Sequence, residues 1–378
     1  MKEGWKYRKF KDVYPIIMGK TPPRGDKSYW DVAKQTHNRW VSIADISRNE
    51  GKVITDTKEY ISDKGTKNIN IVRKGSLLMS FKLTIGKMAF AGKDLYTNEA
   101  IIAIPEDKSY NLKFVYYYLL SYDWKSLSVG KEKVKGATLN KSSIGEIRLP
   151  ILPLSEQQRI VSYLDSAFAK IDVVAKNAED SLNEAKALFQ SALAKMMEPK
   201  EGWEEKHLDE LAENLDYKRI PVTLNKRKSG KYPYYGASGI VDYVEDYIFD
   251  GNYLLISEDG ANLLARATPI AFPVTGKFWV NNHAHILEFK DSITQLFVEF
   301  YFKLIDIKEY VTGAAQPKLT QRNMNKIPIF IPSLDKQKIV VCALQNIESK
   351  VQQLQSNLTR TLSECAALKQ SILRQTFE

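Results

Sequence analysis

The sequence predicts an α+β protein in which two strand-rich domains alternate with two long helices that pair as an antiparallel coiled coil within one chain. The first observation is a repeat: residues 181–191 align without a gap with 361–371, at an offset of 180 residues. Upstream, residues 153–161 resemble 332–340. The second observation is a sustained 4-3 spacing of apolar residues in both segments, which is typical of coiled coils. A chain built in this order is expected to be pseudo-twofold.

The length of 378 residues allows about two or three domains, each large enough for its own core. Glu3-Gly4-Trp5 opens the first half as Glu201-Gly202-Trp203 opens the second. We place a first domain at 1–152, a first long helix at 153–199, a second domain at 200–331 and a second long helix at 332–378.

Each long helix is expected to begin at a serine close behind a proline, Ser155 in the first and Ser333 in the second. Each runs for about 40 residues, or roughly 60 Å at 1.5 Å per residue. Because a whole domain separates the helices along the chain, we expect them to pair with each other; the alternative is a coiled coil between two chains.

The apolar stripe of the first helix is wider than a two-stranded seam needs, because it includes Phe168 and Phe189. Either a further helical partner or the chain's own domains would cover this spare surface. The predicted seam consists of Ile160, Leu164, Ile171, Val174, Leu188, Val340, Leu344, Ile347, Val351, Leu354, Leu358, Leu368 and Ile372.

Both globular halves are predicted to be mixed, with many short strands followed by a short helix. The expected strands are Trp40–Ile46, Gly75–Ser80 and Asn98–Ile104 in the first half, and Tyr253–Ser257, Pro269–Phe272 and His285–Phe289 in the second. The expected helices are Phe114–Leu120 and Leu296–Phe302, whose clustered aromatic residues we assign to the core. The two halves therefore share a layout although their sequences differ.

The net charge of +10 is unevenly distributed. Residues 1–150 hold 28 Lys/Arg against 16 Asp/Glu, a balance of +12, whereas residues 201–330 hold 15 against 18, a balance of −3. The first half is therefore predicted to bind a polyanion through its bulk charge. The second half depends on local basic clusters, namely Lys218, Arg219, Lys226, Arg227, Lys228 and Lys231.

Several classes of protein are disfavoured by composition. No apolar run approaches the roughly 20 residues that span a bilayer, and the first residues have no apolar stretch typical of a signal peptide. The two cysteines, Cys342 and Cys365, indicate a reducing, cytoplasmic location. Four histidines and two cysteines do not give the usual spacing of a structural zinc site.

Motifs that would carry catalysis are missing from the sequence. It has no phosphate-binding loop for ATP, and Gly236–Gly239 is predicted to be a turn. Asp94, Glu106 and Lys108 could be arranged as a nuclease pattern, but the last two lie in a polar turn after a proline. His283 and His285 alternate along a predicted strand and should face opposite sides, which makes them a poor metal pair. We expect no catalytic residues and no metal site.

Several stretches resemble the specificity subunit of Type I restriction-modification systems, and with the duplicated layout the resemblance covers nearly the whole chain. The most telling stretch leads into the first long helix, and others lie in the two domains. They are Ile147–Ile160, Trp40–Ile46, Ile85–Lys87, Tyr234–Ile240, Asp259–Asn262 and Gly276–His285. The chain departs from the family in one place, where Gln157-Gln158 has the counterpart Lys336-Gln337.

The resemblance implies two target recognition domains held apart by the coiled coil, each of which reads one half of a bipartite, asymmetric DNA site. It also implies that two methyltransferase subunits attach to the helices and that restriction subunits complete the complex. S-adenosylmethionine, ATP and Mg²⁺ would then belong to the partners, adenine would be the methylated base, and this chain would be non-catalytic. The alternatives are a standalone site-specific DNA-binding adaptor and a fused nuclease or methyltransferase.

Candidate DNA contacts follow from the needs of phosphates and base edges. Phosphates attract Lys and Arg, and base edges are read by Arg, Asn, Gln and hydroxyl side chains on loops. In the first half we select Lys20, Thr21, Arg24, Lys27, Tyr29, Lys82, Lys131, Lys133 and Lys135. In the second half we select Lys218, Arg219, Lys228, Tyr235, Ser238, Asn262, His283, Gln316 and Lys318.

Overall fold

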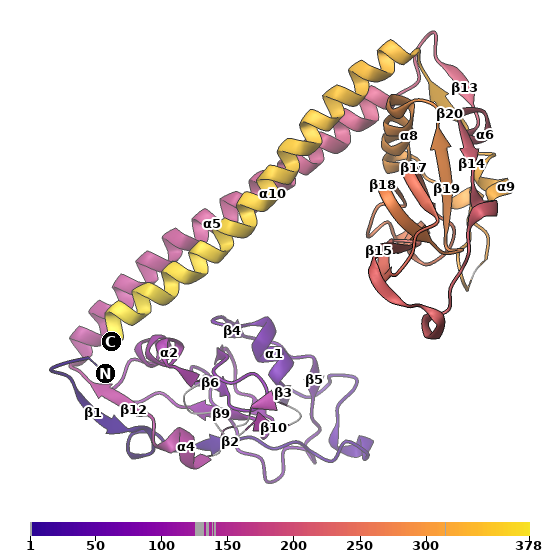
Figure 1. The fold of residues 1–378 in the computed structure, drawn as a ribbon. Helices are drawn as coiled ribbons and strands as arrows, with labels where there is room; N and C mark the ends of the chain where they lie inside the picture. Colours follow the sequence, from indigo (N-terminus) through magenta and orange to yellow (C-terminus); the bar gives the residue numbers. More distant parts are fainter. Residues whose placement is uncertain (1, 125–131, 134–135, 138, 140, 314) are drawn as a thin grey trace. The chain divides into compact units, whose positions relative to one another are not determined.

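The computed structural model describes residues 2–124, 132–133, 136–137, 139, 141–313 and 315–378. The chain divides into two compact units, and each is described by itself. Unit 1 comprises residues 1–177 with 360–378, and unit 2 comprises residues 178–359. Both boundaries fall inside the long helices α5 (Leu154–Met197) and α10 (Leu334–Phe377), so each unit contains one domain and a part of both helices (Figure 1). In the part of the chain that is described, no helix is both long and apolar enough to cross a membrane.

The core of unit 1 is built on a five-stranded sheet. Its order is β2 (Ile17–Met18), β9 (Ile101–Ile104), β6 (Leu77–Ser80), β7 (Met88–Ala91) and β4 (Val53–Ile54). A three-stranded sheet has the order β5 (Glu59–Tyr60), β3 (Arg39–Val41) and β8 (Tyr96–Thr97). Every residue of β6 and β9 is buried, as expected for central strands between two apolar layers.

The strand predicted at Trp40–Ile46 is wrong beyond Val41. The chain turns there into the short helix α1 (Ile43–Arg48), because Ser42 and Asp45 form a reciprocal capping box. The Ser42 side chain accepts a hydrogen bond from the Asp45 amide, and the Asp45 carboxylate accepts one from the Ser42 amide, which stabilises the first turn of a helix. The apolar run looked like a strand because its polar capping residues lie within it.

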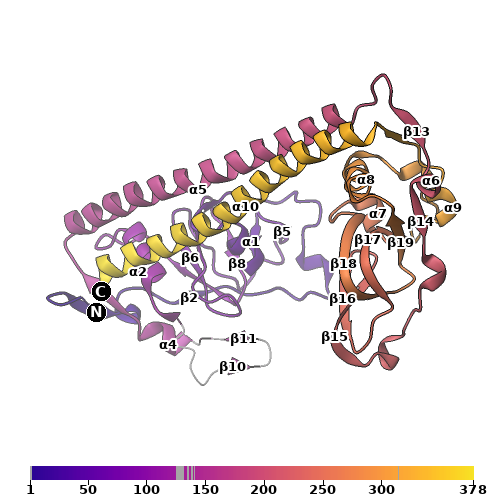
Figure 2. The same ribbon diagram turned by 45° about the horizontal axis from the view of Figure 1, so that its top comes forward.

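Unit 2 is built on a six-stranded sheet. Its order is β14 (Ala212–Asn214), β19 (Ala284–Phe289), β17 (Phe249–Ser257), β18 (Ala271–Val280), β15 (Ser229–Gly236) and β16 (Gly239–Val244). Strand β17 is antiparallel to both of its neighbours. Helix α8 (Ser292–Leu304) lies against this sheet (Figure 2). Its apolar face joins Leu254 and Ile256 in the main core of the unit.

Short elements complete both units. In unit 1 they are β1 (Lys6–Lys9), η1 (Phe10–Asp12), η2 (Lys27–Tyr29), α2 (Leu112–Ser121), β10 (Glu132–Lys133), β11 (Gly136–Ala137), α4 (Lys141–Gly145) and β12 (Arg148–Ile151). In unit 2 they are β13 (Glu204–Lys206), α6 (Leu208–Leu211), η3 (Asp216–Lys218), η4 (Leu224–Lys226), α7 (Asn262–Ala265), η5 (Lys308–Tyr310), α9 (Gln321–Met324) and β20 (Ile329–Ile331).

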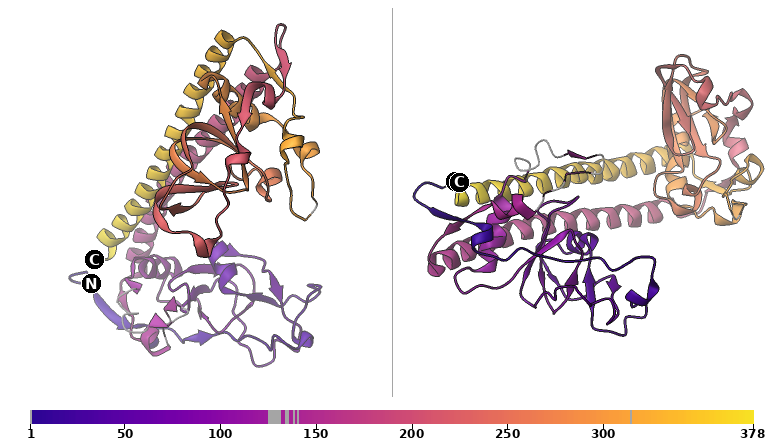
Figure 3. Two further views of the ribbon diagram at one scale, coloured as in Figure 1. Left: turned by 45° about the vertical axis from the view of Figure 1, so that its right-hand side comes forward. Right: turned by 90° about the horizontal axis from the view of Figure 1, so that it is seen from below.

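The two long helices pair antiparallel within each unit. In unit 1 the start of α5 and the end of α10 enter one core, which contains Ile160, Leu164, Leu373 and Phe377. Further along, Lys369 Nζ lies 2.5 Å from a carboxylate oxygen of Asp172. In unit 2 the roles are exchanged, and the end of α5 and the start of α10 share a core that contains Leu193, Met197, Val341 and Leu344. The expected pairing is therefore present, and the two termini come together in unit 1, where Lys2 Nζ donates to the Thr376 carbonyl at 2.8 Å (Figure 3).

The predicted seam is wrong along the second half of α5. Val174 is 53% exposed and Leu188 is 65% exposed, whereas Leu182, Phe189 and Leu193 are buried. The seam follows the lane that contains the two phenylalanines, one position away from the predicted lane. Alanines on both lanes made them hard to tell apart by hydrophobicity. On α10, Leu354 and Leu368 are also exposed, at 38% and 50%. The remaining predicted seam residues are buried or half-buried, namely Ile160, Leu164, Ile171, Val340, Leu344, Ile347, Val351, Leu358 and Ile372.

The repeat holds at an offset of 180 residues through the helix starts as well. The Gln157 amide accepts from Asn111 N at 2.8 Å and donates to Leu152 O at 2.9 Å. The Gln337 amide accepts from Thr294 Oγ1 at 3.0 Å and donates to Pro332 O at 2.8 Å. Both glutamines are buried. Gln157 therefore corresponds to Gln337, which corrects the sequence alignment that paired it with Lys336, because the connection before α10 is one residue longer.

Candidate nucleic-acid interface

Three segments of unit 2 meet where β17 ends and β19 begins. Because these strands are antiparallel and Ser257 pairs with Ala284, the residues after β17 must lie beside those before β19. Glu258 N donates to His283 O at 2.9 Å. The third segment is the chain around Leu319, whose amide donates to Glu258 O at 2.7 Å. This end of the sheet thus gathers loops from distant parts of the sequence.

A network of charged side chains joins these segments. The Glu258 carboxylate accepts from Arg219 Nη1 at 2.6 Å and lies 3.0 Å from Lys318 Nζ. Arg219 also pairs with Asp216 at 3.2 Å and donates to Ala284 O at 2.8 Å. The Arg219 side chain is only 14% exposed. Arg219, a predicted DNA contact, therefore points into its own domain and holds two carboxylates together.

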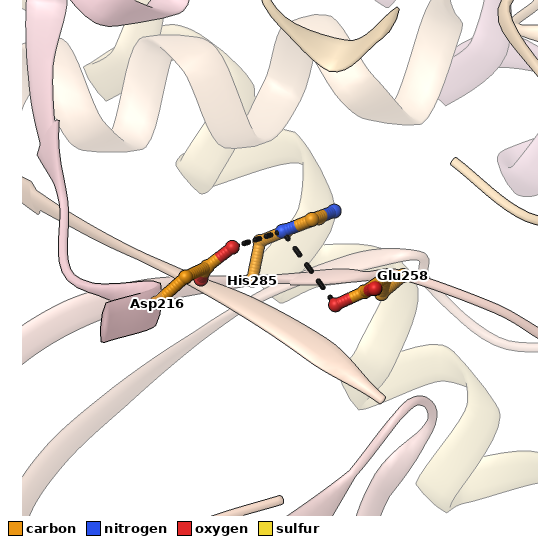
Figure 4. Close-up of side chains that lie close together, drawn as sticks. All are labelled: Asp216, Glu258 and His285. Atoms are coloured by element: carbon orange, nitrogen blue, oxygen red, sulfur yellow. Dashed lines mark hydrogen bonds and ion pairs between the residues drawn. The ribbon is translucent and has the colours of Figure 1, made fainter. Parts of the chain in front are cut away.

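His285 lies at the centre of this network (Figure 4). Its Nδ1 is 2.5 Å from the Asp216 carboxylate and 3.9 Å from Glu258, and its Nε2 is 2.8 Å from the Leu319 carbonyl. The residue is 1% exposed. Both ring nitrogens face oxygen acceptors, so this geometry requires a hydrogen on each of them. The imidazole then joins Arg219 as a second buried cation between Asp216 and Glu258.

The network keeps its carboxylates ionised. Burial alone would raise the pKa of Asp216, but the hydrogen bond and charge of His285, together with Arg219, lower this pKa below its ordinary value. Burial also opposes ionisation of Glu258, and the hydrogen bonds from Arg219 and Lys318 overcome it and lower the Glu258 pKa. Buried charges of opposite sign thus balance each other within the domain.

Asp216, Glu258 and His285 also have the composition of a metal site, since their ligand atoms lie within 4.8 Å of one another. Their lone pairs are already engaged, however. Arg219 occupies both carboxylates, and His285 presents a donor rather than a lone pair to Asp216. A cation would have to displace the guanidinium and deprotonate the imidazole. We therefore interpret the cluster as an internal ion network.

Other predicted contacts of unit 2 surround the same loops. His283 faces the side opposite to His285: its Nδ1 is 2.8 Å from Asp259, and its side chain is 44% exposed. The Tyr235 carbonyl accepts from Asn281 N at 3.0 Å, which places the turn containing exposed Ser238 at this end of the sheet. The Tyr235 ring itself packs against Phe272 and Phe278 in the core.

The remaining candidates of unit 2 differ in their settings. Asn262 exchanges two hydrogen bonds of 3.0 Å with the backbone of Thr268 and so closes its own loop. Gln316 and Lys318 are exposed on one loop, and Lys218 is exposed beside Arg219. Lys228 pairs with Glu245 at 3.4 Å at the far end of the β15–β16 hairpin, away from Ser238. The structure therefore brings together most, but not all, of the predicted set.

In unit 1, Arg24 is the best-ordered of the predicted contacts. Its guanidinium carbon lies 4.0 Å from the ring centroid of Trp30 and 4.8 Å from that of Trp40. Its two terminal nitrogens bond to the Glu59 carboxylate, and the side chain remains 53% exposed. The edge formed by Nε and one Nη keeps unused donors, which is the edge that can bind a guanine bidentately. The group is held flat and ready for a planar partner.

Other basic residues surround Arg24. Thr21 donates to Glu99, and although burial opposes ionisation of this carboxyl, that hydrogen bond and the charges of Lys82 and Arg24 lower its pKa. Lys20 and Lys27 are exposed, and no described carboxylate lies within ion-pair distance of either. The ring of Tyr29, half-buried, is 4.2 Å from Lys64 Nζ. Lys133 lies in β10, while Lys131 and Lys135 lie outside the described residues.

Sequence reasoning missed two kinds of residue at these surfaces. The first is the acidic partner of each basic residue, such as Glu59 or Glu258, because the partner lies far away in the chain. The second is Leu83, which follows Lys82, is 60% exposed and has φ = 65°. An exposed leucine in the left-handed region is unusual and often marks a functional turn. Nothing in the sequence distinguishes it from a core leucine.

These features define a class: a protein with two α+β domains on one repeated frame, each domain carrying a basic loop surface and each clamped by paired long helices. The Type I restriction modification DNA specificity domain model matches residues 2–183 and 200–363. The chain therefore belongs to this family.

Named relatives agree with this assignment. A putative type I restriction enzyme specificity subunit of Haemophilus influenzae, S.HindORF215P, is 40% identical over 149 residues, or 39% of this chain and 38% of that relative. The EcoprrI specificity subunit of Escherichia coli is 23% identical over 381 residues, or 96% of this chain and 90% of that protein.

Solved structures share the fold. One chain, from a structure concerned with complex assembly and conformational transition of the type I R-M system, has a TM-score of 0.75 at 16% identity and covers 100% of this chain and 98% of its own. The HsdS subunit from Thermoanaerobacter tengcongensis has a TM-score of 0.56 at 16% identity, with coverage of 100% and 97%.

Proposed function

We propose that this chain is the DNA sequence-specificity subunit of a Type I restriction-modification complex. The observation that carries the proposal is one frame, repeated at an offset of 180 residues, that supports two different loop surfaces. The helix-start glutamines and the core contacts repeat, whereas Arg24 with its tryptophans and the Glu258 network have no counterparts in the other unit. Two different surfaces on one frame suit an asymmetric, two-part DNA site.

The unit 1 surface is proposed to bind one half-site through Arg24, the lysines around it and bulk positive charge. The unit 2 surface would bind the other through His283, Gln316 and Lys318, since its overall charge is negative. Lysines would contact phosphates and fix the register, while Arg24, Gln316 and loop hydroxyls would read base edges.

The long helices are proposed to bind two methyltransferase subunits, with restriction subunits joining the complex. Exposed apolar side chains on the helices support this role, because such surfaces commonly mark protein interfaces. They are Tyr163, Val173, Val174, Leu188 and Ile339. We propose that the chain is non-catalytic and that S-adenosylmethionine, ATP and Mg²⁺ are bound by the partner subunits.

Mapping of modified bases in the host genome tests the proposal. We expect a methylated two-part motif with a fixed spacer, and we expect it to disappear when this gene is deleted and to return when the gene is restored. An unchanged set of modified bases after deletion would refute the proposed function. Purified chain incubated with S-adenosylmethionine or Mg²⁺ should neither methylate nor cut DNA, and turnover by the chain alone would refute its non-catalytic role.

A further inference from the structure

The loop of residues 312–318 in unit 2 is closed on itself at its base. Thr312 N donates to Lys318 O at 2.9 Å, and Lys318 N donates to Thr312 O at 2.7 Å. The base is also fixed to the segment after β17, because Gly260 N donates to Pro317 O at 2.9 Å and Leu319 N donates to Glu258 O at 2.7 Å. The exposed Gln316 thus projects from a loop whose two ends are held.

The buried ion network holds the same loop through side chains. The Lys318 ammonium binds Glu258 at 3.0 Å, and the His285 ring donates to the Leu319 carbonyl at 2.8 Å. His285 and Glu258 are in turn fixed by Asp216 and Arg219. On the other face, Asp259 orients the exposed His283 ring, and the Glu258 amide binds the His283 carbonyl. One dipeptide, Glu258-Asp259, therefore connects the buried network with the exposed loop residues.

Stability alone does not account for this arrangement. Desolvating several charges costs about as much as their pairing returns, and well-packed apolar residues would stabilise a core as well or better. A charged network does, however, fix hydrogen-bond directions in a way that apolar packing does not. Binding loops need this when they must present donors and acceptors within fractions of an ångström of a base edge.

We propose that Glu258 and His285 are positioning residues for the second half-site. They hold the 312–318 loop and His283 in the arrangement from which Gln316, Lys318 and His283 contact DNA, while they themselves stay away from the DNA. The inference rests on the proposed function and assigns to a set of buried residues the control of specificity at one half-site only.

The test compares Glu258→Gln and His285→Gln with the matched control Glu288→Gln, an exposed glutamate on the same strand as His285. Each variant is assembled with its methyltransferase subunits, and binding is measured on duplexes altered in either half-site. We expect Glu258→Gln and His285→Gln to reduce discrimination at the second half-site by roughly tenfold or more and to leave the first unchanged. Glu258→Asp, which keeps the charge, should recover part of the loss, and Glu288→Gln should match the wild type.

Equal discrimination in the wild type and both variants would overturn the proposal, as would an equal loss at both half-sites, which indicates a merely structural role. If neither variant folds, Lys318→Met removes only the outer tether, at a side chain that is 48% exposed. It should show the same loss confined to the second half-site. A uniform loss of affinity over all sequences would instead make Lys318 a phosphate contact and overturn the positioning role. If the wild-type complex recognises no two-part site, the proposed function itself has failed.

Discussion

At the scale of single residues, the recognition surfaces are pairs rather than isolated cations. Arg24 is held by Glu59, and Lys318 is held by Glu258. The sequence could indicate the basic members, because phosphate and base contacts require them, but their acidic partners are 35 and 60 residues away in the chain. Arg219 shows the cost of this blindness: its charge suggested DNA contact, whereas its partners place it inside the domain.

The pairing makes Arg24 a candidate for base reading rather than simple charge attraction. Arg24→Lys keeps the charge but loses the flat fork and its stacking on Trp30. We expect it to lower discrimination at one base pair of the first half-site by about 1–3 kcal/mol. Lys27→Met should instead weaken binding to all sequences and reduce the salt dependence by about one phosphate contact. Binding titrations at several salt concentrations measure both effects, and equal losses on every sequence for Arg24→Lys would exclude base reading.

At the scale of elements, the long helices were predictable and their seam only partly so. The helices begin and end within two residues of the predicted bounds, since proline and serine mark their starts and a 4-3 pattern runs through them. The choice of lane depends on which domain surfaces the helix meets, and periodicity does not contain that information. For the same reason the capping box at Ser42, a tertiary boundary inside an apolar run, was missed.

Two leucines in unit 2 test the observed seam. Leu344 is fully buried and Leu188 is 65% exposed, although both belong to the predicted seam. We expect Leu344→Ala to lower the free energy of unfolding of unit 2 by about 2–5 kcal/mol, because it leaves a cavity in the core. The matched change Leu188→Ala should alter it by no more than about 0.5 kcal/mol. Denaturant unfolding of the two variants measures the difference, and similar losses would place Leu188 back in the seam.

At the scale of the whole molecule, the repeat and the charge asymmetry were visible in the sequence, while the mutual dependence of chain ends and domains was not. The core of unit 1 includes Leu373 and Phe377, and the Phe377 ring lies 5.5 Å from Tyr118 and 5.7 Å from Phe114 in α2. No local pattern indicates that the last turn of the chain completes the first domain. Such a contact joins residues more than 250 positions apart.

Phe377→Ala is expected to destabilise unit 1 by about 3–5 kcal/mol, because it removes a buried aromatic side chain. Hydrogen exchange should show faster opening of α2 and unchanged protection of α8, since that helix belongs to unit 2. The reciprocal change, Met197→Ala, should expose α8 and spare α2, because Met197 completes the core of unit 2. Loss of protection in both helices from either change would contradict the separate cores.

The position of Phe377 sets an order of events during synthesis. The first domain leaves the ribosome early but lacks part of its core until the final residues have been translated. The second domain has α5 already available and receives the start of α10 sooner. The domain made first is therefore finished last, so a nascent or truncated chain would expose the apolar surface that Leu373 and Phe377 cover, and quality control could sense completeness of the chain at its N-terminal domain.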